Sequence, residues 1–110
     1  MPHIDEFIFH QNLYGLTEIT IPAGVTEIAR NAFSGTSIKS VAIPASVSAV
    51  GEMAFSECQK LETVRYSGKI ISDRMFVHCI KLKNFTITKS TTEIVGGCFN
   101  YCEILTEVTY

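Results

Sequence analysis

Thiol and imidazole groups are the side chains of this chain that are suited to metal or redox chemistry. The cysteines are Cys58, Cys79, Cys98 and Cys102, and the histidines are His3, His10 and His78. The chain lacks the Cys-x-x-Cys spacing typical of zinc sites and thiol-redox motifs. Cys98 and Cys102, four residues apart, could join the His78-Cys79 pair at a metal, and that alternative stays open. We expect structural thiols, with no metal and no cofactor.

The sequence offers little support for a catalytic site. A nucleophilic triad needs a hydroxyl or thiol, a histidine and an acid that converge. The histidines occupy unrelated positions of the repeat described below, and the only aspartates are Asp5 and Asp73. Gly96-Gly97 is too short for a glycine-rich phosphate loop and is better explained by a turn. We expect no enzyme activity.

The element that must position these residues is a repeat of about 22 residues, marked by phenylalanine. The separations along the chain are 24, 22, 21 and 23 residues, between Phe9, Phe33, Phe55, Phe76 and Phe99. Each full repeat opens with an apolar-x-x-apolar-x-apolar pattern, as in Ile38, Val41 and Ile43. Such alternation predicts a short strand with one buried face. Because no single unit can bury its apolar face alone, the units must stack.

The repeat divides a single domain, residues 1–110, into units. Residues 1–15 form a partial unit, four full units follow at 16–37, 38–60, 61–81 and 82–104, and 105–110 hold a truncated last strand. We expect parallel pairing between successive units, with the phenylalanines stacked in a spine. The returning half should hold extended segments and a 3₁₀ or single helical turn around Ala-Phe. The unit at 61–81 lacks two residues there and should be locally tightened.

Three of the cysteines share one repeat position with smaller polar residues. The residues that lie three after each phenylalanine are Asn12, Thr36, Cys58, Cys79 and Cys102. This mixture favours a small side chain that can hydrogen-bond backbone at a tight turn. Stacked cysteines would be close enough for a disulfide but would point the same way. Cys98 shares the position of Ala32 and Ala54, which indicates core filling.

The units resemble the BspA-like, treponemal-type leucine-rich repeat. Residues 16–36, LTEITIPAGVTEIARNAFSGT, follow its pattern L-x-x-[IV]-x-I-P-x-x-V-x-x-I-G-x-x-A-F-x-x-C, and about 100 of the 110 residues are covered. The third and fourth units depart from it, with Ser67 and Thr88 in place of proline. The family glycine, present at Gly51, is replaced in the other units by Ala29, Ser72 and Val95.

This resemblance implies a fold and a function. The fold would be the α/β leucine-rich-repeat class, mostly β: a right-handed solenoid with a parallel sheet and short 3₁₀ or helical turns. The function would be non-catalytic protein–protein contact, often on the surfaces of bacteria and some protists, where adhesion to host proteins is the common theme. A host extracellular protein is therefore the expected partner.

The outward positions of the strands form the candidate binding face. Alternation places Glu18, Ser40, Thr63, Asn84 and Glu107 in one row and Thr20, Ala42, Arg65, Thr86 and Thr109 in the next. We expect partner binding by Glu18, Ser40, Thr63, Arg65, Asn84, Thr86 and Glu107. Arg65 is the one long functional side chain at the centre of this face. The alternative is an ordinary solvated strand surface, the default for exposed polar residues.

Charge excludes some classes of ligand and leaves others open. A net charge of −2 gives no overall attraction to nucleic acid or anionic lipid. Residues 60–89 nevertheless carry seven bases and two acids, the bases being Lys60, Arg65, Lys69, Arg74, Lys81, Lys83 and Lys89. This segment could attract an acidic partner or a sulfated glycan, or it could be a solvated surface. No aromatic residues interleave the bases in the way that nucleic-acid binding favours.

The sequence gives two opposed expectations for the cellular compartment of the protein. No run of 18 apolar residues is present, so no membrane span is expected. The first residues lack the basic and apolar regions of a secretory signal, which predicts a cytoplasmic protein if the chain is full length. The family resemblance instead implies the cell surface or the extracellular space.

The last strand is the candidate self-association edge. Because the pattern stops within a unit at residues 105–110, we expect an open strand edge formed by Leu105, Glu107, Thr109 and Tyr110. An unpaired edge invites another strand. The alternatives are a homo-oligomer through this edge, or a segment of a longer repeat array with no ligand of its own.

Overall fold

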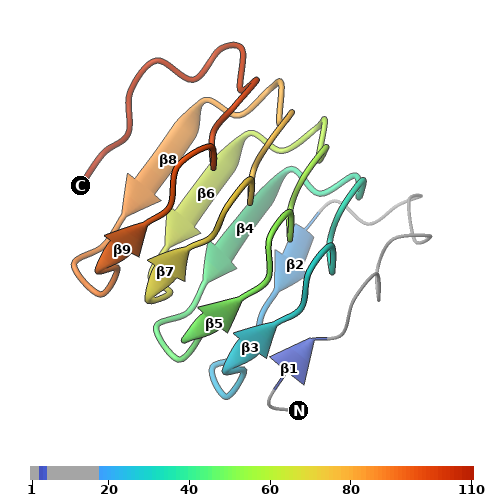
Figure 1. Ribbon diagram of the computed structural model, residues 1–110. Coiled ribbons are helices and arrows are strands. Elements are labelled where there is room, and N and C mark those ends of the chain that lie inside the picture. Colours follow the sequence, from blue (N-terminus) through green and yellow to red (C-terminus); the bar gives the residue numbers. More distant parts are fainter. Residues whose placement is uncertain (1–2, 5–17) are drawn as a thin grey trace.

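Four short parallel strands, one from each successive repeat, form the broad side of the molecule. The computed structural model describes residues 3–4 and 18–110. The strands are β2 (Glu18–Thr20), β4 (Ser40–Ile43), β6 (Thr63–Tyr66) and β8 (Asn84–Ile87), paired in that order. Figure 1 shows them side by side along the stack, each contributed by one coil of the chain. The expected parallel, mostly β leucine-rich-repeat solenoid is confirmed.

Alternation decides which side chains of these strands enter the core. In β6, Val64 and Tyr66 are buried while Thr63 and Arg65 are exposed, and β4 and β8 follow the same order. Cα partners are spaced by whole repeats, so that Val41 lies beside Val64 and Val64 beside Phe85. Each core position therefore forms a column of apolar side chains, which stacking with the next coil removes from water.

A second row of two-residue strands forms the adjacent side of the coil. It comprises β1 (His3–Ile4), β3 (Glu27–Ile28), β5 (Ala49–Val50), β7 (Ile70–Ile71) and β9 (Glu93–Ile94). The row is split into β1-β3-β5 and β7-β9. At the break, the hydroxyl of Ser72 donates to the carbonyl oxygen of Val50. The interruption falls where the third unit is two residues short, and there the Tyr66 hydroxyl donates to Ile70 O at 2.5 Å.

Two consecutive turns form the third side, in place of the 3₁₀ or helical turn that we expected around Ala-Phe. Among residues 18–110 the chain forms no helix. In the first described turn pair, the N–H groups of Ala32, Ser34 and Thr36 donate three residues back, as in a helical turn. Those of Asn31, Phe33 and Gly35 donate instead to carbonyls of the next repeat, at 3.3, 2.8 and 3.0 Å. Alternate N–H groups therefore point along the stack, and a helix cannot form.

This alternation requires left-handed backbone two residues before and two residues after each phenylalanine. Positive φ occurs at Asn31 and Gly35, and again at the matching positions of the later repeats, Met53, Glu57, Arg74, His78, Gly97 and Tyr101. Glycine and asparagine adopt this region most readily. The remaining residues carry some strain that the inter-repeat hydrogen bonds must offset.

The expected phenylalanine spine runs through the interior. Phe33 and Phe55 stack with centroids 4.8 Å apart, Phe55 and Phe76 at 5.5 Å, and Phe76 and Phe99 at 6.1 Å. Phe85, from β8, meets the edge of this stack at Phe76 with centroids 5.1 Å apart. The spine supplies the largest apolar groups of the core and ties all described repeats together.

Candidate functional site

The outward face of the large sheet has the two rows that alternation predicts. Register places Glu18, Ser40, Thr63 and Asn84 in one row, and Thr20, Ala42, Arg65 and Thr86 in the other. Thr109 bridges to Thr86 and extends the second row, and Glu107, two residues earlier, is also exposed. The side chain of Thr20 lies outside the described part. We call this surface the strand face.

A shallow hollow of about 300 Å³ lies in the strand face over β2, β4 and β6. It contains four of the seven expected contact residues together with Ala42, and its lining is Glu18, Ile19, Ser40, Val41, Ala42, Thr63 and Arg65. Asn84, Thr86 and Glu107 are not part of it. The hollow exists because a methyl group at Ala42 and short hydroxyls at Ser40 and Thr63 lie between the longer Glu18 and Arg65.

The two charged residues of the hollow are available to a partner. Within the described part of the chain, neither Arg65 nor Glu18 forms an ion pair. The charged pairs that do form lie elsewhere: Lys83 with Glu62 at 3.7 Å and Arg30 with Glu52 at 3.6 Å. The hollow therefore combines a free cation, a free anion and hydroxyl groups, and it has hydrogen-bonding and ionic capacity but no catalytic grouping.

The basic residues of segment 60–89 contribute one cation, Arg65, to the lining of the hollow. Lys69 precedes β7 at the second row, and Arg74 lies on the turn side. Lys60 and Lys81 lie at the same position of adjacent coils, three residues before β6 and β8. A polyanion in the hollow would therefore meet Arg65 without the other bases of this segment.

The C-terminal segment pairs with β8 more briefly than a full strand would. The Thr109 N–H donates to Phe85 O at 2.9 Å, and the Ile87 N–H donates to Thr109 O at 2.7 Å. This single bridge replaces the strand that we expected over residues 105–110. Because backbone groups alternate direction along an extended chain, those of Val108 and Tyr110 face away from β8. Leu105 is half-buried, whereas Glu107, Thr109 and Tyr110 are exposed.

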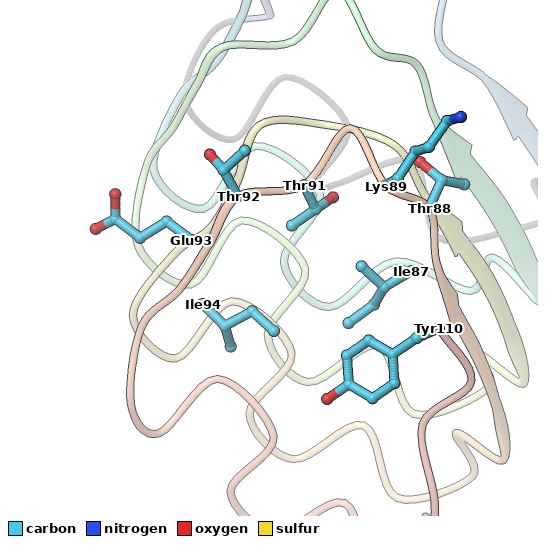
Figure 2. A pocket seen from close by; sticks show the side chains of 8 residues that line it. All are labelled: Ile87, Thr88, Lys89, Thr91, Thr92, Glu93, Ile94 and Tyr110. Atoms are coloured by element: carbon cyan, nitrogen blue, oxygen red, sulfur yellow. The ribbon is translucent and has the colours of Figure 1, made fainter.

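A cavity of about 410 Å³ opens beside this edge, and sequence reasoning did not find it. Figure 2 shows Ile87, Ile94 and Tyr110 along its lower side and the threonines and Lys89 above. Ile94 is 46% exposed and Tyr110 86%, although Ile28, Ile71 and Tyr66 at the matching repeat positions are buried. The repeat alignment contained the signal: Ile94 and Tyr110 occupy positions at which most earlier coils have a buried residue.

A third depression, of about 420 Å³, lies on the turn side and was also missed. Its lining includes the left-handed residues Glu57, Arg74, His78 and Tyr101. The rings of His78 and Tyr101 stack with centroids 4.6 Å apart. Both residues lie two after a phenylalanine, so the repeat spacing could have paired them.

The three cysteines that share one repeat position hydrogen-bond the backbone, and the hydrogen bond with Cys79 lowers the pKa of Cys58. All four are free thiols. The Sγ atoms of Cys58, Cys79 and Cys102 donate to the carbonyls of Phe33, Phe55 and Phe76, each at 3.2 Å. The hydrogen bond with Cys58, together with burial, raises the pKa of Cys79 far above the usual thiol range. Burial raises the pKa of Cys102 to about 11, and thiols with such values are poor nucleophiles at neutral pH.

Two further features of the chain bear on ligand classes. Within residues 3–4 and 18–110, no three His, Cys, Asp or Glu side chains come together as metal ligands. In the same part of the chain, no helix reaches the length and apolar character that a membrane span requires.

The parallel coil, its phenylalanine spine and its repeat length define a leucine-rich-repeat solenoid. A family model described as the BspA type leucine-rich repeat region, with six copies, matches residues 2–110. The chain belongs to this family, which confirms the resemblance. The six copies compare with four complete and two partial units counted from the sequence. Among curated protein sequences, none matches the chain.

Solved structures of bacterial leucine-rich-repeat proteins share the fold. One from Eubacterium ventriosum has a TM-score of 0.88 at 25% identity, covering 100% of this chain and 30% of its own. One from Bacteroides capillosus has a TM-score of 0.78 at 31% identity, covering 90% and 80%. A leucine-rich cell surface protein from Faecalibacterium prausnitzii has a TM-score of 0.70 at 25% identity, covering 84% and 31%. The chain thus spans less than a third of the first of these proteins.

Proposed function

We propose that this chain is a non-catalytic protein-binding module of a bacterial surface protein that contacts its partner through the strand face. The observation that carries the proposal is the hollow over Ala42, with Arg65 and Glu18 at its rims, neither of which forms an ion pair within the described residues. Exposed charges without such a partner are available for recognition.

Membership of the BspA-type family and the surface location of the Faecalibacterium neighbour favour an adhesive role. A host extracellular protein is the partner that fits such a role. Surface location can be tested directly with an antibody against the chain. Labelling of intact cells supports the proposal, whereas labelling only after the cells are opened contradicts it.

The binding test uses short random peptides displayed on phage and selected on the immobilised 110-residue chain. Ala42→Trp fills the hollow with an indole at an exposed position, so it leaves the core unchanged. Ala49→Trp, on exposed β5, is the matched control. Selected peptides should bind the wild type and the Ala49→Trp variant but should not bind the Ala42→Trp variant. The strand-face assignment is wrong if no selected peptide distinguishes the two variants.

Self-association is a second candidate, supported by the exposed Ile94 and Tyr110 at the open edge. A second copy placed there would cover apolar side chains and pair with the outward backbone groups of Val108 and Tyr110. Leu105, Glu107, Thr109 and Tyr110 would then lie at the contact.

Sedimentation velocity over increasing concentration tests this. The wild-type chain should form a larger species, and Ile94→Asp with Tyr110→Asp should remain monomeric. Ala45→Asp, at an exposed turn, serves as the control. A wild type that stays monomeric at every concentration excludes this contact.

A further inference from the structure

The surroundings of Arg65 define the group that it can bind. Its neighbours across the sheet are Ala42 and Thr86, and Thr63 precedes it by two residues on the same strand. Arg65 therefore leaves the strand face between a methyl group and a hydroxyl residue, and no carboxylate of the described chain lies within ion-pair distance of its guanidinium. A planar carboxylate satisfies the guanidinium fork with two hydrogen bonds, and the threonine hydroxyls can donate further ones.

Glu18, at the opposite rim of the hollow, can bind a positively charged group of the partner. It lies two strands away from Arg65 and one row across. With strands about 4.8 Å apart and two residues of offset, the Cα atoms of Glu18 and Arg65 are about 12 Å apart. An extended chain advances about 3.3 Å per residue, so groups that satisfy both sites are three or four residues apart.

Because the hollow has both a positive and a negative side chain, a peptide is a better ligand for it than a polyanion. A sulfated glycan or nucleic acid gains affinity by contacting several cations at once. Among the described residues that line the hollow, Arg65 is the only cation, and Glu18 would repel a chain of anions. The small floor at Ala42 also suits a backbone lying close to the sheet.

On the basis of the proposed strand-face function, we propose that the hollow recognises an extended protein segment with an acidic residue over Arg65 and a basic residue three or four positions away over Glu18. The segment crosses β6, β4 and β2. Recognition depends on the presence and spacing of both charges, because a segment with two like charges places one of them beside its like, whereas a segment with the opposite order can bind in the opposite chain direction.

The experiment extends the peptide selection with a charge reversal. Peptides selected on the wild type should be enriched in an acid and a base at that spacing, and replacing the acid by its amide should weaken binding about tenfold. Arg65→Glu, which leaves two acids at the rims, should reject these peptides and, in a new selection, enrich two bases at the same spacing. Lys69→Glu, at an exposed position outside the hollow, makes the same change in net charge and should bind the original peptides normally.

The outcomes separate this inference from the function on which it rests. Peptides that require an open hollow at Ala42, yet show no paired charges, overturn the charge-pair recognition and leave the strand-face function standing. Enrichment of acidic residues alone, or binding of the selected peptides to Arg65→Glu as strong as to the wild type, also overturns it. Peptides indifferent to Ala42→Trp overturn both.

Discussion

Gly51 lies at the closest approach between two repeats, and replacing it by alanine should destabilise the fold strongly. A Cβ atom at this position would overlap the backbone nitrogen of Arg30 and fall 2.5 Å from Arg30 Cα and 2.9 Å from the carbonyl carbon of Ala29. These are backbone atoms, which cannot move aside as a flexible side chain can. The two coils must therefore separate locally.

The expected cost follows from the contacts that separation disrupts. Gly51 N–H donates to Ile28 O at 2.8 Å, and this bond lies in the ladder between β3 and β5. Overpacking costs about 1–3 kcal/mol and a weakened hydrogen bond about 1 kcal/mol, so we expect about 3 kcal/mol. That is a large share of the roughly 5–15 kcal/mol that stabilise a small domain. It corresponds to a fall in Tm of about 12 °C.

Urea unfolding followed by circular dichroism measures the free energy of unfolding. Gly24→Ala is the control, because a Cβ there meets no atom within 4 Å, and its free energy of unfolding should stay within about 0.5 kcal/mol of wild type. Ser72 and Val95 occupy the same repeat position, so the tight approach is specific to the first two complete coils. A Gly51→Ala variant as stable as Gly24→Ala would refute the close approach.

Three further changes test other parts of the fold. Phe55→Ala, in the middle of the spine, should cost about 4 kcal/mol in denaturant unfolding, and the half-buried Phe99→Ala clearly less. Glu57→Gly should relieve a left-handed φ of 55° and raise stability by about 0.5 kcal/mol, whereas Glu27→Gly in β3 should lower it; equal effects would contradict the strain. Burial raises the pKa of Cys102 from 9.0 to about 11, so the stability that the protonated thiol contributes is complete below pH 9 and lost towards pH 11. Cys102→Val should flatten the decline of the free energy of unfolding between these pH values. An unchanged decline would contradict the assignment to Cys102.

The sequence sufficed to predict features that repeat. The openers, the outward rows and the phenylalanine spine recur at fixed positions, and each is constrained by identical neighbours above and below. The backbone hydrogen bond of Cys58 could be predicted from its column, because Thr36 at the same position is also small and able to hydrogen-bond. The parallel register then follows, since shifting a strand by one residue would expose Val41 and bury Arg65.

Features that depend on the exact path of the backbone could not be predicted. The turn around Phe33 has helical spacing in its local hydrogen bonds, and only the left-handed φ of Asn31 and Gly35 diverts alternate N–H groups to the next coil. Asparagine and glycine do not identify such a turn by themselves, since Arg74 and His78 adopt the same left-handed conformation. The hollow over Ala42 likewise depends on the relative lengths of neighbouring side chains across three strands.

The same asymmetry explains where functional information lies in this fold. An interior column accepts only residues that fit the coils on either side, so its composition reports the scaffold. An outward column is free of that constraint, and stability alone would fill it with short polar or β-branched residues such as Ser40, Thr63 and Thr86. Arg65 and Glu18 depart from that composition without pairing inside the described chain. The spacing of Arg65 and Glu18 across two strands is therefore the feature of the strand face that a partner can recognise.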